Sequence, residues 1–274
     1  MLVILDLGLF VKFPVLCNFN TVLFGEYMSV FEVLSPSEHR DMKILTEVGE
    51  SLGDDVQYAT TYSLEFRSIQ AHYPIFFSKN EKDEFSPVAL FGFEKNENLF
   101  LNKNTWDASY IPMMVQRQPF SIGLQVSENG QEKPIVSIEK NSPRISNEKG
   151  QRIFDQEGNP TEYLTRVMSK LEALHHGHEH NKVFVEALLE NELLEPFTLK
   201  IPLKNNSNNE LIGFYTINEE KLLDLSGAVL ESFNVNGYLQ PIYMALAAYS
   251  RINVLIEKKN KKIQNEWDEK LNSK

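Results

Sequence analysis

Three adjacent segments decide the fold of this chain: the stretch YPIFFS (residues 73–78), the charged turn KNEKDE (79–84) and the run PVALFGF (87–93). Short apolar runs rich in aromatic and β-branched residues, bounded by polar turns, predict short strands. The next such run is residues 98–101, and the segment 95–97 between them has the character of a tight turn. We therefore expect residues 87–93 and 98–101 to form a hairpin.

Further strand pairs are predicted on both sides of this region. Residues 120–126 and 135–138 flank Glu128-Asn129-Gly130, and residues 197–203 and 211–217 flank an asparagine-rich loop at 205–209. Each pair joins two apolar runs across residues that favour turns, which is the pattern of a hairpin.

Helices are predicted between these strands. A short helix is expected over residues 108–116, and a longer one begins with Asn159 as the N-cap and Pro160 at the first helical position. We expect Gly177 to end that helix and a second helix to cover residues 181–193. Short helices follow after Asn218, over residues 227–235 and from Tyr238 onwards.

Strands and helices are mixed along the chain without regular alternation, which favours α+β over a doubly wound parallel sheet. We expect one globular domain of mixed or antiparallel hairpins with amphipathic helices, because 274 residues can bury a sizeable core. The predicted divisions are an N-terminal segment at 1–27, the domain at 28–250 and a basic helical tail at 251–274.

Charge and cysteine content exclude several classes. The formal net charge is −11, which opposes binding to nucleic acid and to anionic lipid. The single cysteine, Cys17, excludes an intrachain disulfide and any multi-cysteine metal site. The sequence predicts a soluble acidic protein that binds no nucleic acid.

Residues 1–27 are apolar but interrupted by Asp6, Lys12 and Glu26. The first basic residue lies inside the apolar run and no small-residue cleavage site follows, so a secretory signal is not indicated. The charges also argue against a membrane-spanning helix. We expect Met28 to be the true initiator and the protein to be cytoplasmic, with a native N-terminal strand or helix and a degenerate targeting signal as the alternatives.

No complete catalytic motif is present. The chain lacks GxSxG, GxGxxG and GxxxxGK[ST], so neither a serine-hydrolase elbow nor a nucleotide-binding loop is visible, and no cofactor is indicated. In the cluster HHGHEH (175–180), His176 and His180 stand at the i, i+4 spacing of metal-binding helices. Gly177 interrupts that spacing, so we predict a histidine-rich turn and no metal site.

The region between residues 98 and 120 carries the candidate ligand-binding residues, Trp106, Tyr110 and Arg117. Arg117 is the only arginine between Arg67 and Arg144, and its planar fork suits a carboxylate, either of the fold or of a ligand. A structural ion pair with Asp107 or Asp155 is the favoured alternative.

The tail after residue 251 keeps apolar residues at helical spacing among lysines, ending in Trp267 and Leu271. This pattern suits a helix that docks a protein partner or a second copy of the chain. The competing prediction is a solvated terminal helix.

Blocks of this sequence, in order, resemble the SapC family. They are YPIFF (73–77), PVALFG (87–92), ENLF (97–100), the residues Trp106, Asp107 and Tyr110-Ile111-Pro112, RQPF (117–120), SPR (142–144), FDQEGNPT (154–161), FVEAL (184–188) and LIGFY (211–215). The resemblance extends over about residues 28–250.

The resemblance implies an association with the bacterial surface layer and its export. Genes for members also lie near flavin-dependent halogenases and TonB-dependent receptors, which implies work on a peptide or small molecule. Our first hypothesis is a non-enzymatic binding or accessory protein of the surface layer or cell envelope. The cell-surface location that the resemblance implies is the alternative to the cytoplasmic location expected above. The alternative is a cytoplasmic enzyme, or enzyme partner, that acts on a peptide or small-molecule ligand.

Overall fold

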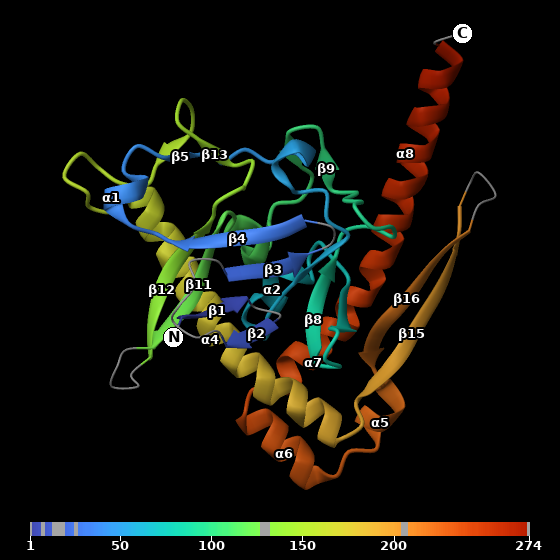
Figure 1. Cartoon of the computed structure of the whole chain (residues 1–274). Helices are drawn as coiled ribbons and strands as arrows, with labels where there is room; N and C mark the ends of the chain where they lie inside the picture. Colours follow the sequence, from blue (N-terminus) through green and yellow to red (C-terminus); the bar gives the residue numbers. More distant parts are fainter. Residues whose placement is uncertain are drawn as a thin grey trace. The chain divides into compact units, whose positions relative to one another are not determined.

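The computed structural model describes the backbone of residues 2–6, 9–12, 20–24, 27–126, 132–203 and 208–272, and the side chains of residues 30–123, 134–203 and 210–272. The chain divides into two compact units. Their helices and strands are labelled in Figure 1. The first unit comprises Met1–Gly53 with Met113–His178, and the second comprises Asp54–Pro112 with Glu179–Lys274.

The first unit is built on a sheet with the strand order β2-β1-β11-β12-β4-β3. The strands are β1 (Leu2–Asp6), β2 (Leu9–Lys12), β3 (Asn20–Phe24), β4 (Tyr27–Val33), β11 (Phe120–Val126) and β12 (Glu132–Glu139). A second, small sheet contains β13 (Ile145–Ser146), β5 (Lys43–Ile44) and β14 (Gln151–Arg152) in that order. The first unit also contains the short helices α1 (Pro36–His39), η1 (Glu50–Leu52) and α3 (Met113–Gln116), together with the first part of a long helix described below.

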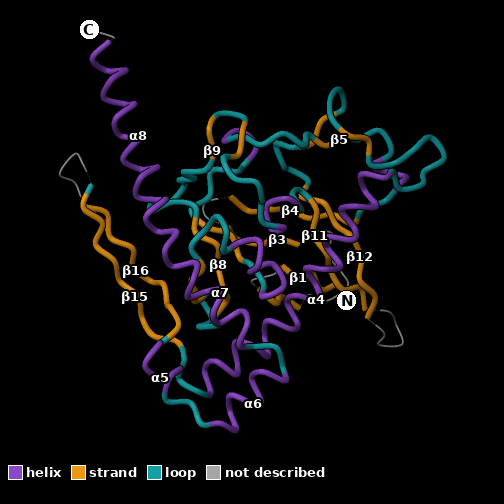
Figure 2. Tube along the Cα trace, turned by 180° about the vertical axis from the view of Figure 1, so that it is seen from behind, coloured by secondary structure: helices purple, strands orange, loops and turns teal. Residues whose placement is uncertain are grey.

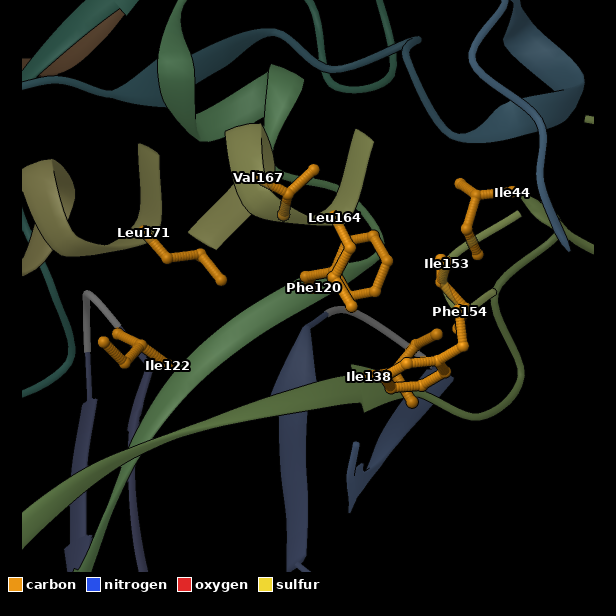
Figure 3. Packing of buried hydrophobic residues seen from close by; sticks show 9 residues of the cluster. All are labelled: Ile44, Phe120, Ile122, Ile138, Ile153, Phe154, Leu164, Val167 and Leu171. Carbon is orange, nitrogen blue, oxygen red and sulfur yellow. The ribbon is translucent and has the colours of Figure 1, made fainter. Parts of the chain in front are cut away.

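The core of the first unit lies between β11, β12 and the start of helix α4 (Glu162–Glu190) (Figure 3). Leu164, Val167 and Leu171 lie on one face of the helix, because residues three to four apart share a face. They pack with Phe120, Ile122 and Ile138 from the two strands, and with Ile44, Ile153 and Phe154. The predicted strand pair at 120–126 and 135–138 is therefore confirmed as β11 and β12.

The second unit is built on a sheet with the order β15-β16-β7-β8-β6. Its strands are β6 (Tyr58–Thr60), β7 (Ile75–Lys79), β8 (Phe85–Leu90), β15 (Leu194–Pro202) and β16 (Asn208–Ile217), and β9 (Leu101–Asn102) pairs separately with β10 (Thr105–Trp106). The helices are η2 (Ser63–Glu65), α2 (Phe66–Ile69), α5 (Glu219–Leu223), α6 (Gly227–Val235), α7 (Leu239–Ala248), η3 (Tyr249–Arg251) and α8 (Ile252–Asn272). Figure 2 shows α5 at the base of the long β15–β16 hairpin.

The hairpin of β7 and β8 is closed by Asn80. Its Oδ1 accepts hydrogen bonds from the backbone N–H groups of Lys82 and Glu84, each at 2.9 Å, so one side chain organises the whole turn. Ile75, Phe76 and Phe77 are all buried in β7, which explains why this strand is a continuous apolar run.

The predicted fold class, α+β with antiparallel hairpins, is confirmed, because every strand pair of the described residues is antiparallel. None of the helices in the described ranges has the length and apolar character needed to cross a bilayer. The expected domain of residues 28–250 includes β4 and most of both units, whereas β1, β2 and β3 lie within 1–27.

Several local expectations differ from the structure. The run at 87–93 does not form a strand ladder with 98–101, although the Leu99 N–H donates to the Phe91 carbonyl oxygen at 2.9 Å; β8 instead pairs with β7 and β6. Gly92 approaches the following loop so closely that a Cβ there would lie 2.3 Å from the carbonyl oxygen of Glu97. The helix expected over 108–116 begins only at Met113, because Pro112 disfavours helical geometry in the residue before it.

The third difference concerns α4, which runs unbroken through Gly177 instead of ending there. A glycine inside a helix costs about 1 kcal/mol relative to alanine, and burial of the flanking apolar residues outweighs this. The helix begins at Glu162, where the Thr161 hydroxyl accepts a hydrogen bond from the Leu164 N–H at 3.3 Å. Asn159, the expected N-cap, instead donates to Asp155.

Candidate functional site

Tyr73 joins two of the predicted ligand-binding residues in the second unit. Its hydroxyl donates to the carbonyl oxygen of Tyr110 at 2.5 Å and accepts from Nε1 of Trp106 at 2.7 Å. The Tyr73 ring is completely buried and makes edge contacts with Phe91 and Phe100. Tyr73 thus brings Trp106 and Tyr110 together. From the sequence, Tyr73 was expected only in a strand and was not among the candidate ligand-binding residues.

The Tyr110 hydroxyl extends this network to a buried carboxylate. It donates to Oε1 of Glu65 at 2.7 Å, and Thr61 donates to Oε2 at 3.4 Å. Burial raises the pKa of Tyr110 well above its usual value, and the negative charge of Glu65 adds to this shift. Burial also raises the pKa of Tyr73, against the opposing effect of its bond from Trp106. Both phenols therefore keep their protons near neutral pH.

Arg117, the third predicted ligand residue, belongs to the first unit. It is half-buried, and its Nη1 donates to the carbonyl oxygen of Phe120 at 2.7 Å. The two carboxylates considered as its partners have other contacts: Asp107 pairs with Lys258 at 2.5 Å, and Asp155 accepts two hydrogen bonds from Asn159. The hydrogen bond to Phe120 ties Arg117 to the first residue of β11.

The histidine cluster lies on continuous helix, so His176 and His180 do stand one turn apart. His180 shares a hydrogen bond with the Ser63 hydroxyl at 3.1 Å, and its ring contacts Tyr238 edge-on. The described residues contain no group of three or more histidine, cysteine or acidic side chains placed to hold a metal ion. Two imidazoles alone make an incomplete site for zinc, which takes at least three protein ligands.

The lysines of α8 bind acidic residues of the second unit. Nζ of Lys259 contacts Glu94 at 2.8 Å and Glu97 at 2.7 Å, and Lys258 lies over the Phe100 ring as well as against Asp107. The basic half of the predicted tail therefore packs against the chain itself. Trp267 and Leu271, at the end of α8, remain 48% and 72% exposed.

A groove of about 440 Å³ lies between the C-terminal part of α4 and helix α6, which run side by side (Figure 1). We call it the α4–α6 groove. The α4 wall is formed by Val183, Glu186, Ala187, Glu190 and Asn191. Positions at this spacing share one helical face, so the wall is a continuous stripe along α4.

The opposite wall is supplied by α6 and the residues that follow it. It consists of Ala228, Val229, Ser232, Phe233, Asn236 and Tyr238. Helix α6 starts at Ser226, whose hydroxyl accepts from the Val229 N–H, and it buries Phe233. The Tyr238 ring packs against Phe233 and Phe184, which joins the two walls by aromatic contacts.

The groove combines apolar and polar surface. Valine and alanine side chains supply apolar area, whereas two carboxylates and two amides supply hydrogen-bonding groups. The side-chain amides of Asn191 and Asn236 donate to the carbonyl oxygens of Ala187 and Ser232, one turn earlier in each helix, which orients them. No sequence signal marked this site, because its walls come from segments about 40 residues apart.

A model of the SapC family matches residues 34–255, and the chain therefore belongs to the SapC family. The predicted resemblance is confirmed by this match. No curated protein and no solved structure matches the chain.

Proposed function

We propose that this SapC-family protein is a non-enzymatic binding or accessory protein of the bacterial surface layer or cell envelope. We further propose that it holds a peptide or small-molecule ligand in the α4–α6 groove. The observation that carries this proposal is the groove itself, which is open, lined by oriented amides and walled by two helices. Its volume of about 440 Å³ falls within the range of about 300–1,000 Å³ typical of ligand sites.

The hydrogen bonding of the predicted ligand residues supports the groove over the Trp106 region. Trp106 uses its indole N–H, and Tyr110 its hydroxyl, for bonds inside the fold. Such groups hold the 100–112 segment to the core and give a ligand less to recognise. Trp106, Tyr110 and Arg117 remain proposed ligand contacts of secondary rank.

The alternative function is an enzyme, or enzyme partner, acting on a peptide or small molecule in the cytoplasm. It is favoured by the contact of the Tyr110 hydroxyl with the buried Glu65 carboxylate, because proton-transfer sites use such pairs. We rank it second, since Glu65 is only 2% exposed and would be hard for a substrate to reach.

Groove binding can be tested by ligand-observed NMR with a fragment library and a set of short peptides. Ala228 lines the groove, so Ala228→Trp should fill it and abolish the signals of groove ligands. Ala247 is exposed on α7 and outside the groove, so Ala247→Trp is the matched control and should leave them unchanged. Equal signals from both variants would contradict groove binding.

The proposed envelope role makes a separate prediction about location. Fractionation of the producing cells, followed by detection of the native protein, should recover it with the envelope or surface-layer fraction. Recovery in the cytoplasmic fraction would instead support the alternative function.

A further inference from the structure

The α4 wall of the groove carries two like charges one turn apart. Glu186 and Glu190 are both exposed, and within the described part of the chain neither forms an ion pair. Lys182 precedes Glu186 by one turn without reaching it, and Lys221 binds Glu192 at 2.7 Å. Like charges at this spacing repel each other and destabilise a helix, and a cation between them would relieve that repulsion.

The remaining groove surface also favours a cation. Among the described residues that line the groove, none is basic. The whole chain carries a formal charge of −11, which attracts a cationic ligand over distances up to the Debye length. An arginine or lysine side chain placed between the two carboxylates would gain both charge-assisted hydrogen bonds.

The dimensions of the groove favour a peptide over a single amine. Its α4 wall runs from Val183 to Asn191, which at 1.5 Å per residue is about 12 Å. Extended chain advances about 3.3 Å per residue, so three to four residues fit along the wall. The Oδ1 atoms of Asn191 and Asn236 accept no hydrogen bond from any described residue, and they can accept from peptide N–H groups.

From these observations we infer that the α4–α6 groove binds a short basic segment of a partner protein. The bound segment places an arginine or lysine between Glu186 and Glu190 and small apolar side chains against Ala187 and Val229. This inference rests on the proposed function and names the chemical class of its ligand.

The test uses the full chain and three blocked pentapeptides with alanine at every position except the central one. The central residue is arginine, its neutral isostere citrulline, or glutamate. Binding is followed from backbone amide chemical shifts, with Ala187 and Ser232 as reporters of the groove. We expect saturable shifts with the arginine peptide, at least tenfold weaker binding of the citrulline peptide, no binding of the glutamate peptide, and weakening with added salt.

Two double variants distinguish the effect of the groove carboxylates on binding from the effect of the net charge of the chain. Glu186→Gln with Glu190→Gln should weaken binding of the arginine peptide at least tenfold. Glu172→Gln with Glu179→Gln removes the same charge from exposed positions of α4 outside the groove and should change binding less than twofold. Equal weakening by both pairs would overturn the inference, because the peptide would then respond to net charge alone.

The outcomes also distinguish this inference from the proposed function. Equal groove shifts from the arginine and citrulline peptides would refute the cationic ligand and leave the groove as a binding site. If no peptide and no library fragment shifts the groove amides, both the inference and the groove assignment fail.

Discussion

Lys259 and Glu97 form a buried ion pair that joins α8 to the loop after β8. Nζ of Lys259 lies 2.7 Å from Oε1 of Glu97, and the two side chains are 10% and 5% exposed. The second carboxylate oxygen accepts from the Phe93 N–H at 3.0 Å. Because both groups are shielded from water, each depends on the other for compensation of its charge.

Replacement of Lys259 by methionine should lower the free energy of unfolding by about 3 kcal/mol, because Glu97 is then left buried without its partner. Lys262 is 3.7 Å from the same oxygen, beyond hydrogen-bond distance, and compensates only in part. Urea unfolding measures the effect. The exposed Lys261→Met is the control and should stay within about 0.5 kcal/mol of the wild type. A Lys259→Met protein as stable as the control would show that the pair contributes nothing.

Stability should fall at alkaline pH. Burial raises the pKa of Tyr73 and Tyr110, and for Lys259 the hydrogen bonds to Glu94 and Glu97 outweigh burial and raise its pKa as well. A group whose pKa is higher in the folded state stabilises fully below its unfolded pKa, about 10 for these side chains, and loses that contribution as the pH rises. The urea midpoint should therefore drop between about pH 10 and pH 11.5. A urea midpoint that stays constant over this pH interval would contradict the raised pKa values of these three side chains in the folded protein.

Tyr73→Phe tests the network that holds Trp106. The substitution keeps the ring contacts with Phe91 and Phe100 but leaves the indole N–H of Trp106 and the carbonyl oxygen of Tyr110 without their common partner. Loss of one partner of buried polar groups costs about 1–3 kcal/mol. Denaturant unfolding should show that loss. Tyr58→Phe, at a position 41% exposed, is the control, and an equal effect of both changes would argue against the network.

Local signals in the sequence predicted local structure well. Asn218 was expected to start a helix, and its side chain accepts from the Lys221 N–H at 2.9 Å at the start of α5. Residues 227–235 were expected to be helical, and α6 has those bounds. In each case a capping or turn residue acts on the backbone within a few positions, so the sequence alone contains the whole interaction.

Interactions between distant residues could not be predicted in this way. Lys259 and Glu97 are 162 positions apart, and no spacing rule connects them. The prediction that the helix ends at Gly177 was wrong. The free energy that a glycine costs within a helix is smaller than the free energy gained by packing the flanking turns. The two walls of the groove likewise come from α4 and α6, which the β15–β16 hairpin and α5 separate along the chain.

A chain that starts at Met28 should fold and keep its thermal midpoint. It lacks β1, β2 and β3, but it retains β4 with its pairing to β12. Among the described side chains, the core of the first unit is formed by Leu34 and later residues. Calorimetry of the two proteins measures the difference. A fall of several degrees would show that the strands before Met28 stabilise the sheet through the β1–β11 pairing.

Arg117→Lys separates a structural arginine from a ligand-binding one. The guanidinium donates to the carbonyl oxygen of Phe120 at 2.7 Å, at the start of the strand that carries much of the core of the first unit. A lysine cannot reproduce the planar fork, and hydrogen bonds of charged groups contribute about 1.5–3 kcal/mol. We therefore expect Arg117→Lys to lower the free energy of unfolding by about that amount in urea, whereas the exposed Arg67→Lys should change it by less than about 0.5 kcal/mol. An Arg117→Lys protein of unchanged stability would show that this bond contributes little to folding, and it would favour the ligand-binding role of Arg117.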